Sequence, residues 1–198
     1  GAVDRGAKPA VTNAIAKYHS TEKFRQIIND GMDILGGAAI CRGPRNLLSH
    51  TYMGVPVGIT VEGANIMTRG LIQFGQGAVR CHPYSYLEMK ALVNNDLDAF
   101  DHNFWGHVGH LVRNTCRTIA LSLTRGYAHQ PTQRGVIAKY ERKLAWASAK
   151  FAFMSDAALA IYGAGIKRHE NISGRFGDVL SYMLMAVCTL RRFEAEGE

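Results

Sequence analysis

Apolar residues recur with the period of an α-helix over most of this chain, and that period limits the folds open to it. Three long stretches, residues 104–127, 134–162 and 173–193, each carry an apolar stripe along one side. Pro9 can open an earlier helical region, which continues to Gly36. A helix with one apolar side buries that side against another helix. We therefore predict an all-α fold, a helical bundle with additional packed helices.

Residues 38–60 differ from the rest, because glycine and proline interrupt them repeatedly. This pattern is typical of a loop-rich connection, in which we expect one short helix over residues 45–52. Valine and isoleucine then alternate with other residues over residues 55–61, as in a strand, but no second run offers a partner. We expect this run to be extended and buried, and not to form a sheet.

Helical spacing resumes after this segment. We expect a helix over about residues 63–79, which ends before Pro83, and a shorter one from Ser85 to Leu92. The polar residues from Asn94 to Asp96 then predict a turn or a helix cap. We expect the helices beyond this turn to pack on those before it, because their apolar stripes need a partner.

Composition limits the class of protein further. The chain has 198 residues, of which 47% are hydrophobic and 20% charged, so it can bury one sizeable core. No run of eighteen apolar residues occurs, so we expect no membrane-spanning helix. The first residues form no signal peptide and include no Met, so we expect a piece of a longer protein. The four cysteines lie in no metal-binding spacing, which predicts reduced thiols in a cytoplasmic protein.

The net charge of +7 has two interpretations. It can mark a surface for anions, such as nucleic acid, phospholipid or a phosphorylated cofactor. It can also arise in a piece whose acidic counterweight lies elsewhere. Basic residues are spread without a dense block or interleaved aromatic residues, so we expect no nucleic-acid partner. A basic helix face formed by Lys139, Arg142, Lys143 and Lys150 can meet phosphates or lipid, or can simply be solvated.

Glu62 is the residue whose surroundings point most directly to chemistry. It is the only carboxylate between Asp33 and Glu88, and its neighbours are apolar residues and glycines. A carboxylate in such a setting loses hydration, which favours a role as a general base near neutral pH. Acidic residues also favour the first turn of a helix, which gives Glu62 a purely structural alternative.

Two other groups of residues invite a chemical interpretation. His102, His107 and His110 lie close together in sequence, but a metal site needs a third ligand of fixed geometry, and this spacing fits no common signature. We interpret them as a polar helix face and expect no metal. Cys81 and His82 are adjacent, but neighbouring side chains at a helix end point apart, so we expect no catalytic pair.

The motifs around Glu62 resemble those of the C-terminal helical domain of the acyl-CoA dehydrogenase family. The segment Asp33-Ile34-Leu35-Gly36-Gly37 is similar to that family's glutamine-x-x-glycine-glycine motif, which touches the FAD of a neighbouring subunit. The segment Val61-Glu62-Gly63-Ala64-Asn65 is similar to its tyrosine-glutamate-glycine-threonine motif. Residues 66–83 resemble the long bacterial fatty acyl-CoA dehydrogenases, and residues 113–190 resemble the start of their extra helical extension.

The resemblance implies a role for each matched residue. Glu62 is the catalytic base that removes the α-proton of the acyl thioester, and Gly63 contacts the thioester through its backbone. The residues matched to the flavin-contacting positions are Asp33, Gly36, Gly37, Ala64 and Ile66. Three of these depart from the family, since Asp33 replaces a glutamine, and Ala64 and Ile66 stand where threonine and glutamine are usual.

The resemblance also implies a function and an organisation. It implies part of an FAD-dependent enzyme that oxidises fatty acyl-CoA to trans-2-enoyl-CoA in fatty acid β-oxidation, with flavin N5 accepting hydride. Most of the flavin site then belongs to other domains, with residues 1–93 in the dehydrogenase C-terminal domain and 94–198 in the extension. An electron-transfer acceptor protein, a homo-oligomer and a cytoplasmic location, peripheral at the inner membrane, are further expectations. The alternative is a helical interaction or oligomerisation module of dehydrogenase ancestry, in which Glu62 is a relic.

Overall fold

The structure is a computed structural model that describes residues 3–197, apart from the side chains of Val3 and Ala164. The described residues are almost entirely helical and contain no strand, which confirms the predicted all-α class. The α-helices are α1 (Ala10–Leu35), α2 (Gly37–Ile40), α3 (Ser49–Thr60), α4 (Asn65–Met67), α5 (Gly77–Cys81), α6 (Ser85–Val93), α7 (Leu97–Leu123), α8 (Val136–Tyr162) and α9 (Glu170–Glu196). A π-helix (Thr68–Gln76) lies between α4 and α5, and 3-10 helices cover Val3–Arg5 and Gly163–Arg168.

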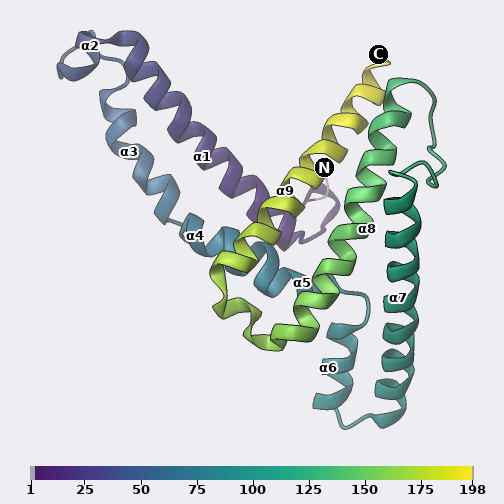
Figure 1. Cartoon of the computed structure of the whole chain (residues 1–198). Helices are drawn as coiled ribbons and strands as arrows, with labels where there is room; N and C mark the ends of the chain where they lie inside the picture. Colours follow the sequence, from purple (N-terminus) through teal and green to yellow (C-terminus); the bar gives the residue numbers. More distant parts are fainter. Residues whose placement is uncertain (1–2, 198) are drawn as a thin grey trace.

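The helices form two arms that meet at the π-helix (Figure 1). One arm consists of α1, α2 and α3, with α3 packed along α1. The other consists of α7, α8 and α9, in which α8 packs against both neighbours and α6 packs against α7. At the junction the π-helix packs against both α1 and α9, so the helices beyond residue 94 pack on those before it.

The core of the junction is aromatic. The Phe74 ring of the π-helix is 2% exposed and stacks on Phe176 of α9, with ring centroids 4.4 Å apart and planes 9° apart. Ala158 of α8 and Ile166 of the following 3-10 helix complete the buried cluster. Burying a phenylalanine of this kind stabilises the fold by roughly 1.5–3 kcal/mol.

Two glycines allow α9 to approach the π-helix closely. A Cβ atom at Gly177 would lie 2.4 Å from the backbone oxygen of Arg69, and one at Gly174 would lie 2.9 Å from the Arg69 guanidinium. Any side chain at Gly177 would therefore push the two backbones apart. The short distance between these elements depends on the absence of a side chain there.

The extended segment predicted for residues 55–61 is wrong, because most of it belongs to helix α3. The half-buried or buried positions Thr51, Val55, Gly58 and Ile59 recur at helical spacing, and α3 packs along α1. Val57 and Val61 are 58% and 48% exposed, so the segment is not buried as a whole. A short run of alternating apolar residues does not distinguish strand from helix, and here packing against α1 decided it. The short helix expected over residues 45–52 likewise starts only at Ser49.

Several other predicted boundaries agree with the structure, but two predicted helices differ. Residues 63–79 are divided among α4, the π-helix and α5, and the stretch predicted over residues 104–127 forms α7 from Leu97 to Leu123. Helix α1 ends at Leu35, and Gly36 follows with a φ of 56°, a positive value that glycine adopts readily. Helix α6 begins at Ser85 as expected. The predicted cap at Asp96 is confirmed, since its side chain accepts a hydrogen bond from the Ala99 amide at 3.0 Å. The four cysteines form no disulfide and are all exposed.

Helix α8 is long and apolar enough to cross a membrane by length and composition, which the sequence analysis did not anticipate. Its most apolar window is 22% buried. The same composition occurs in core helices of globular proteins, so a single helix of this kind is weak evidence for a membrane span. The charged residues of the helix include Lys150 and Asp156, and charged side chains are costly inside a bilayer.

The arm made of α1, α2 and α3 has many apolar side chains on its outside. Ile34, Ile40 and Leu47 at its free end are 80–85% exposed, and Ile27 and Val57 further along are about 60% exposed (62% and 58%). Contiguous exposed apolar surface marks a site where another protein surface packs. The arm thus carries exposed apolar side chains from its free end to its middle.

The packing at Gly177 predicts the effect of a single methyl group. Gly177→Ala should destabilise the protein by roughly 1–3 kcal/mol, because its Cβ would overlap the Arg69 backbone oxygen. Gly109→Ala in α7 is the matched control, since a Cβ there meets nothing within 4 Å, and it should be neutral or stabilise by up to about 1 kcal/mol. Urea unfolding measures both, and equal midpoints for the two variants would contradict the close packing.

Candidate active site at the Glu62 turn

Glu62 lies in the turn that joins α3 to α4, here called the Glu62 turn (residues 61–64). Its backbone has φ 56°, and Gly63 follows with φ 90°. A non-glycine residue in this conformation costs of order 1–3 kcal/mol and persists only where its surroundings hold it. Such residues occur often at functional sites. Helix α4 begins at Asn65, so the prediction of a helix start within a few residues of Glu62 is confirmed.

Contacts to the Gly63 carbonyl hold the turn. Lys17 of α1 donates to the Gly63 oxygen at 2.8 Å, and the Thr68 hydroxyl of the π-helix donates to the same oxygen at 3.3 Å. Lys17 also donates to the Asn65 side-chain oxygen at 2.7 Å. The turn is thus attached to α1 on one side and to the π-helix on the other.

The Asn65 side chain completes this attachment. Asn65 is 3% exposed, and its amide nitrogen donates to the Thr21 hydroxyl at 2.9 Å and to Glu22 Oε1 at 2.8 Å, both on α1. Because buried polar atoms are costly without partners, these contacts fix where α4 starts. The sequence analysis did not identify Lys17, Thr21 or Asn65 as site residues, since nothing in the sequence relates α1 to this turn.

The Glu62 side chain itself is exposed, contrary to the expectation that its neighbours would desolvate it. Within residues 3–197 its carboxylate has no hydrogen-bond or ion-pair partner. The apolar neighbours Val61 and Ile66 are themselves 48% and 70% exposed. A free carboxylate on a backbone that is held in place can accept a proton from a ligand that covers this surface.

The two predicted motifs lie at opposite ends of the arm. Gly36 and Gly37 join α1 to α2 at its free end, whereas the Glu62 turn lies near the junction (Figure 1). The 12 residues of α3 lie between these ends, which corresponds to about 18 Å at 1.5 Å per residue. Asp33, Gly36 and Gly37 are exposed there, while Ala64 and Ile66 stay beside Glu62. One copy of this chain therefore does not bring the glycine segment to the Glu62 turn.

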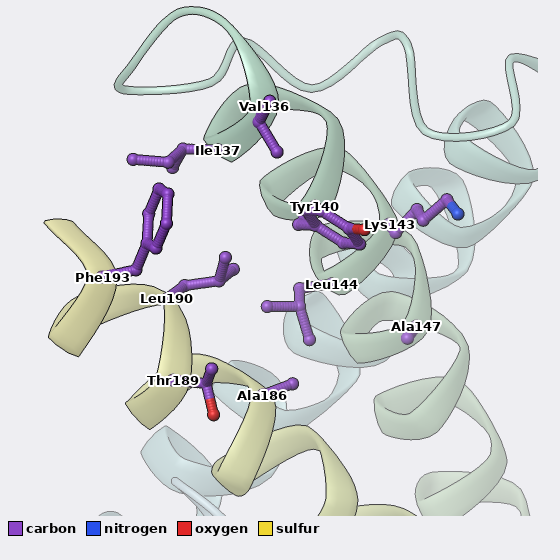
Figure 2. Close-up of a pocket in the computed structure, with 10 residues that line it drawn as sticks. All are labelled: Val136, Ile137, Tyr140, Lys143, Leu144, Ala147, Ala186, Thr189, Leu190 and Phe193. Carbon is purple, nitrogen blue, oxygen red and sulfur yellow. The ribbon is translucent and has the colours of Figure 1, made fainter. Parts of the chain in front are cut away.

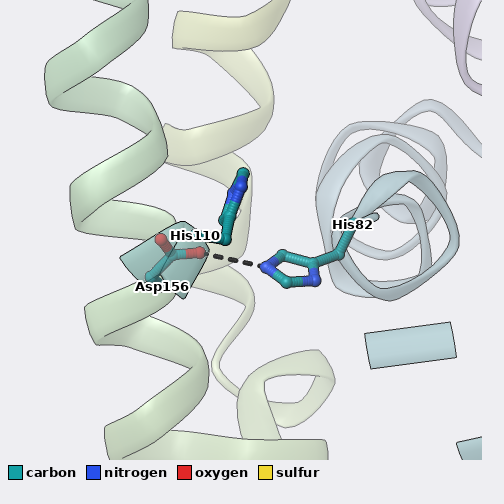
Figure 3. A group of neighbouring side chains, drawn as sticks. All are labelled: His82, His110 and Asp156. Carbon is teal, nitrogen blue, oxygen red and sulfur yellow. Dashed lines mark ion pairs between the residues drawn. The ribbon is translucent and has the colours of Figure 1, made fainter. Parts of the chain in front are cut away.

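A second polar cluster, which the sequence analysis missed, lies where the turn before α6 meets α7 and α8. The Nε2 atom of His82 faces Asp156 Oδ1 at 3.3 Å, and His110 lies beside both (Figure 3). The side chains of His82 and Asp156 are only 7% and 5% exposed. Asn114 donates to His110 Nε2 at 2.8 Å and to Asp156 Oδ2 at 3.4 Å. His82 and Asp156 are far apart in sequence, so only the fold unites them.

His82, His110 and Asp156 have the residue types of a metal site, and their ligand atoms lie within 4.8 Å of one another. The hydrogen bonds of His82 do not fit that role. Its Nδ1 accepts the backbone N–H groups of Tyr84 and Ser85 at 3.2 and 3.0 Å, so this nitrogen carries no proton. The proton of the neutral ring then lies on Nε2, the atom that would have to bind a metal. The cluster fits a proton donor facing a carboxylate.

The three histidines predicted to form a polar helix face have different surroundings. His102 is exposed, His107 pairs with Glu88 at 2.9 Å, and His110 belongs to the buried cluster. Burial lowers the pKa of His110 and outweighs the attraction of Asp156. Burial would raise the pKa of Asp156, but its contacts with His82 and Asn114 hold that pKa below its ordinary value.

An apolar groove of about 530 Å³ lies between α8 and α9 (Figure 2). Leu144, Leu190 and Phe193 line it, and Lys143 is the one charged residue among its lining side chains. Most of the lining is apolar, so the groove is suited to binding an apolar group, and Tyr140, Lys143 and Thr189 are its polar lining residues. Three cations of the predicted basic face lie over aromatic rings: Arg142 over Tyr127 at 5.0 Å, Lys143 over Tyr140 at 5.8 Å and Lys150 over Trp146 at 4.1 Å.

Comparison with known protein families matches residues 79–198 to the family described as acyl-CoA dehydrogenase, C-terminal, bacterial type. The match covers more than half of the chain and includes α6 to α9. It starts beyond the Glu62 turn, and it starts before residue 94, where the sequence analysis divided the chain. No solved structure matches the chain.

The cluster of His82, His110 and Asp156 predicts that the protein loses stability in acid. A histidine whose pKa is lower in the folded state binds protons more readily when unfolded, so its contribution is lost as the pH falls below the unfolded pKa of about 6.5. The free energy of unfolding should therefore fall between pH 7.5 and 5.5, and His110→Gln should reduce this fall. Burial also lowers the pKa of His19, so part of the fall in stability should remain in the His110→Gln variant.

Urea unfolding at a series of pH values measures this dependence. The matched control is His102→Gln, an exposed histidine of the same helix, which should leave the pH dependence unchanged. A pH dependence that is identical in His110→Gln and the unchanged protein would show that His110 gains no proton on unfolding.

Proposed function

This chain belongs to the acyl-CoA dehydrogenase family, as a C-terminal region of its bacterial type, and on that basis we propose that it is part of an FAD-dependent enzyme that oxidises fatty acyl-CoA to trans-2-enoyl-CoA in β-oxidation. Family membership makes an oxidoreductase the coarse assignment. The observation that supports the finer one is Glu62, an exposed carboxylate held at φ 56° in a turn with hydrogen bonds from two helices.

In the proposed reaction Glu62 accepts the α-proton of the thioester. This proton is weakly acidic, so the base must already be in place on one face of the Cα–Cβ bond. The left-handed backbone of Glu62 is held by the Lys17 and Thr68 contacts to Gly63, which restrict where the carboxylate can point. The backbone N–H of Glu62 is the proposed donor to the thioester carbonyl, where negative charge develops.

FAD supplies the hydride acceptor, N5, when it is bound. Gly36 and Gly37 fit a contact to such a group, because they are exposed and a Cβ atom at either would meet nothing within 4 Å. Ala64 and Ile66 can offer backbone and apolar contacts only. Asp33 fits less well, since a carboxylate repels a pyrophosphate. The positions of these two groups at opposite ends of the arm favour contacts to the flavins of two different subunits.

The remaining partners follow from the same proposal. The exposed apolar surface of the arm supports a homo-oligomer and coverage by the other domains of the enzyme. Fatty acyl-CoA is the proposed substrate, and an electron-transfer protein reoxidises the flavin. Free cysteines support a cytoplasmic location, and the basic face of α8 supports peripheral binding at the inner membrane.

A second candidate is a non-catalytic module for helical interaction or oligomerisation. The exposed apolar surface of the arm favours it equally, because a docking element needs the same surface. The two candidates differ in what they require of Glu62. A docking module needs no carboxylate there.

Glu62→Gln in the complete enzyme separates these candidates. An amide keeps the shape of the side chain but cannot accept the proton, so the rate of flavin bleaching by a saturated acyl-CoA under anaerobic conditions should fall by about 10²–10⁴-fold. FAD content and substrate binding should stay near normal. The matched control is Glu170→Gln, at an exposed position at the start of α9, which should bleach at the normal rate.

Two results would contradict the assignment. Bleaching of the Glu62→Gln enzyme at an unchanged rate would mean that another residue is the base. Loss of flavin from that variant, without a slower chemical step in the flavin that remains, would support a structural role for the turn.

A further inference from the structure

The Glu62 turn depends on the position of the π-helix. Thr68 is the first residue of the π-helix, and its hydroxyl binds the Gly63 carbonyl. Helix α4 connects the turn to the π-helix through only three residues, Asn65–Met67. A shift or rotation of the π-helix therefore moves Gly63 and the backbone of Glu62 with it.

Helix α9 holds the π-helix by two polar contacts one turn apart. The guanidinium of Arg69 binds Asp178 of α9 through two hydrogen bonds, of 2.7 and 2.5 Å. The Ser181 hydroxyl lies 3.0 Å from Gln73 Oε1 and 2.7 Å from the Gly177 carbonyl, between which its single proton is shared, and Ser181 and Gln73 are both 0% exposed. A bidentate arginine–carboxylate pair fixes orientation as well as distance.

The π-helix is a conformation that needs such support. Its i→i+5 hydrogen bonds are uncommon over more than a single turn, and π-helical segments occur often at functional sites. Here the segment extends over 9 residues. Gly177 brings the α9 backbone against Arg69, and Phe176 stacks on Phe74, so α9 contacts the π-helix through backbone, aromatic and polar groups at once.

We propose that α9 is a positioning element for the catalytic base, in which Asp178 and Ser181 hold Arg69 and Gln73 and thereby set the place of Glu62. This inference rests on the proposed function and adds to it a role for the bacterial-type C-terminal region, to which α9 belongs. Asp178 touches neither substrate nor flavin in this proposal. It acts through Arg69, the π-helix and the Gly63 carbonyl.

The proposal predicts a particular kinetic effect of Asp178→Asn in the complete enzyme. A base displaced by about 1 Å can lose on the order of 10²-fold in rate, so we expect flavin bleaching at saturating acyl-CoA to slow by about 10- to 10²-fold. FAD content and KM should change less than about twofold, because binding groups elsewhere are unaffected. Arg191→Gln is the matched control, since it removes another ion pair of α9, Arg191–Glu194, away from the π-helix. It should bleach normally.

A double variant separates positioning from general stability. If Asp178 acts through Glu62, Asp178→Asn should cost almost nothing further in the Glu62→Gln enzyme, because the base is already absent. If the fold-decreases in bleaching rate of the two single variants multiply in the double variant, Asp178 acts independently of Glu62 and the proposal is overturned. Reversal of the pair, Arg69→Asp with Asp178→Arg, should restore at least part of the rate lost in Asp178→Asn, because both side chains are about one-third exposed.

The outcomes also separate this proposal from the proposed function. If the bleaching rate of Glu62→Gln is unchanged, Glu62 is not the base, and the positioning role proposed for α9 fails with it. If Glu62→Gln bleaches slowly and Asp178→Asn bleaches at the normal rate, Glu62 remains the proposed base and only the positioning role fails. If Asp178→Asn does not fold or loses its flavin, Ser181→Ala gives the same test, because it removes the polar contact between Ser181 and Gln73.

Discussion

The close approach of α9 to the π-helix is the contact on which the rest of the structure depends. Gly177 makes it possible, and the stacked rings of Phe74 and Phe176 make it apolar. The other helices attach outward from this junction: α1 packs on the π-helix, α8 on α9, α7 on α8 and α6 on α7. The arm of α1, α2 and α3 touches the remainder through the same place, so the orientation of the arm is decided at the junction (Figure 1).

The Glu62 turn shows how a locally unfavourable conformation is maintained. A left-handed glutamate costs of order 1–3 kcal/mol, and a typical hydrogen bond contributes about 0.5–1.5 kcal/mol net. Two donors reach the Gly63 carbonyl, and the buried Asn65 side chain bonds to α1. Together these contacts are of the size needed to offset the strain. The conformation therefore depends on α1 and the π-helix, and not on residues 61–64 alone.

The polar cluster around Asp156 concerns the packing of α7 and α8 and the turn before α6. His82 comes from the turn before α6, His110 and Asn114 from α7, and Asp156 from α8. Nδ1 of His82 accepts two backbone N–H groups, which turns the Nε2 side of the ring towards Asp156 at 3.3 Å. Such a cluster favours this packing of the helices, because a buried carboxylate is costly without its partners.

The sequence by itself determined the helical class and several helix boundaries, and it singled out Glu62 as the candidate base. Three of the signals are local: the apolar stripes of period 3.6, the glycine at position 36 and the cap at Asp96. A local signal depends only on neighbouring residues, so it can be recognised without knowledge of the tertiary fold. The isolated carboxylate of Glu62 was visible for the same reason. Only the tertiary structure decided that residues 49–60 form a helix, because the choice depended on packing against α1. It also decided what holds Glu62 in place, since Lys17, Asn65 and Asp178 act across contacts between segments distant in the chain, and no local pattern encodes such pairs.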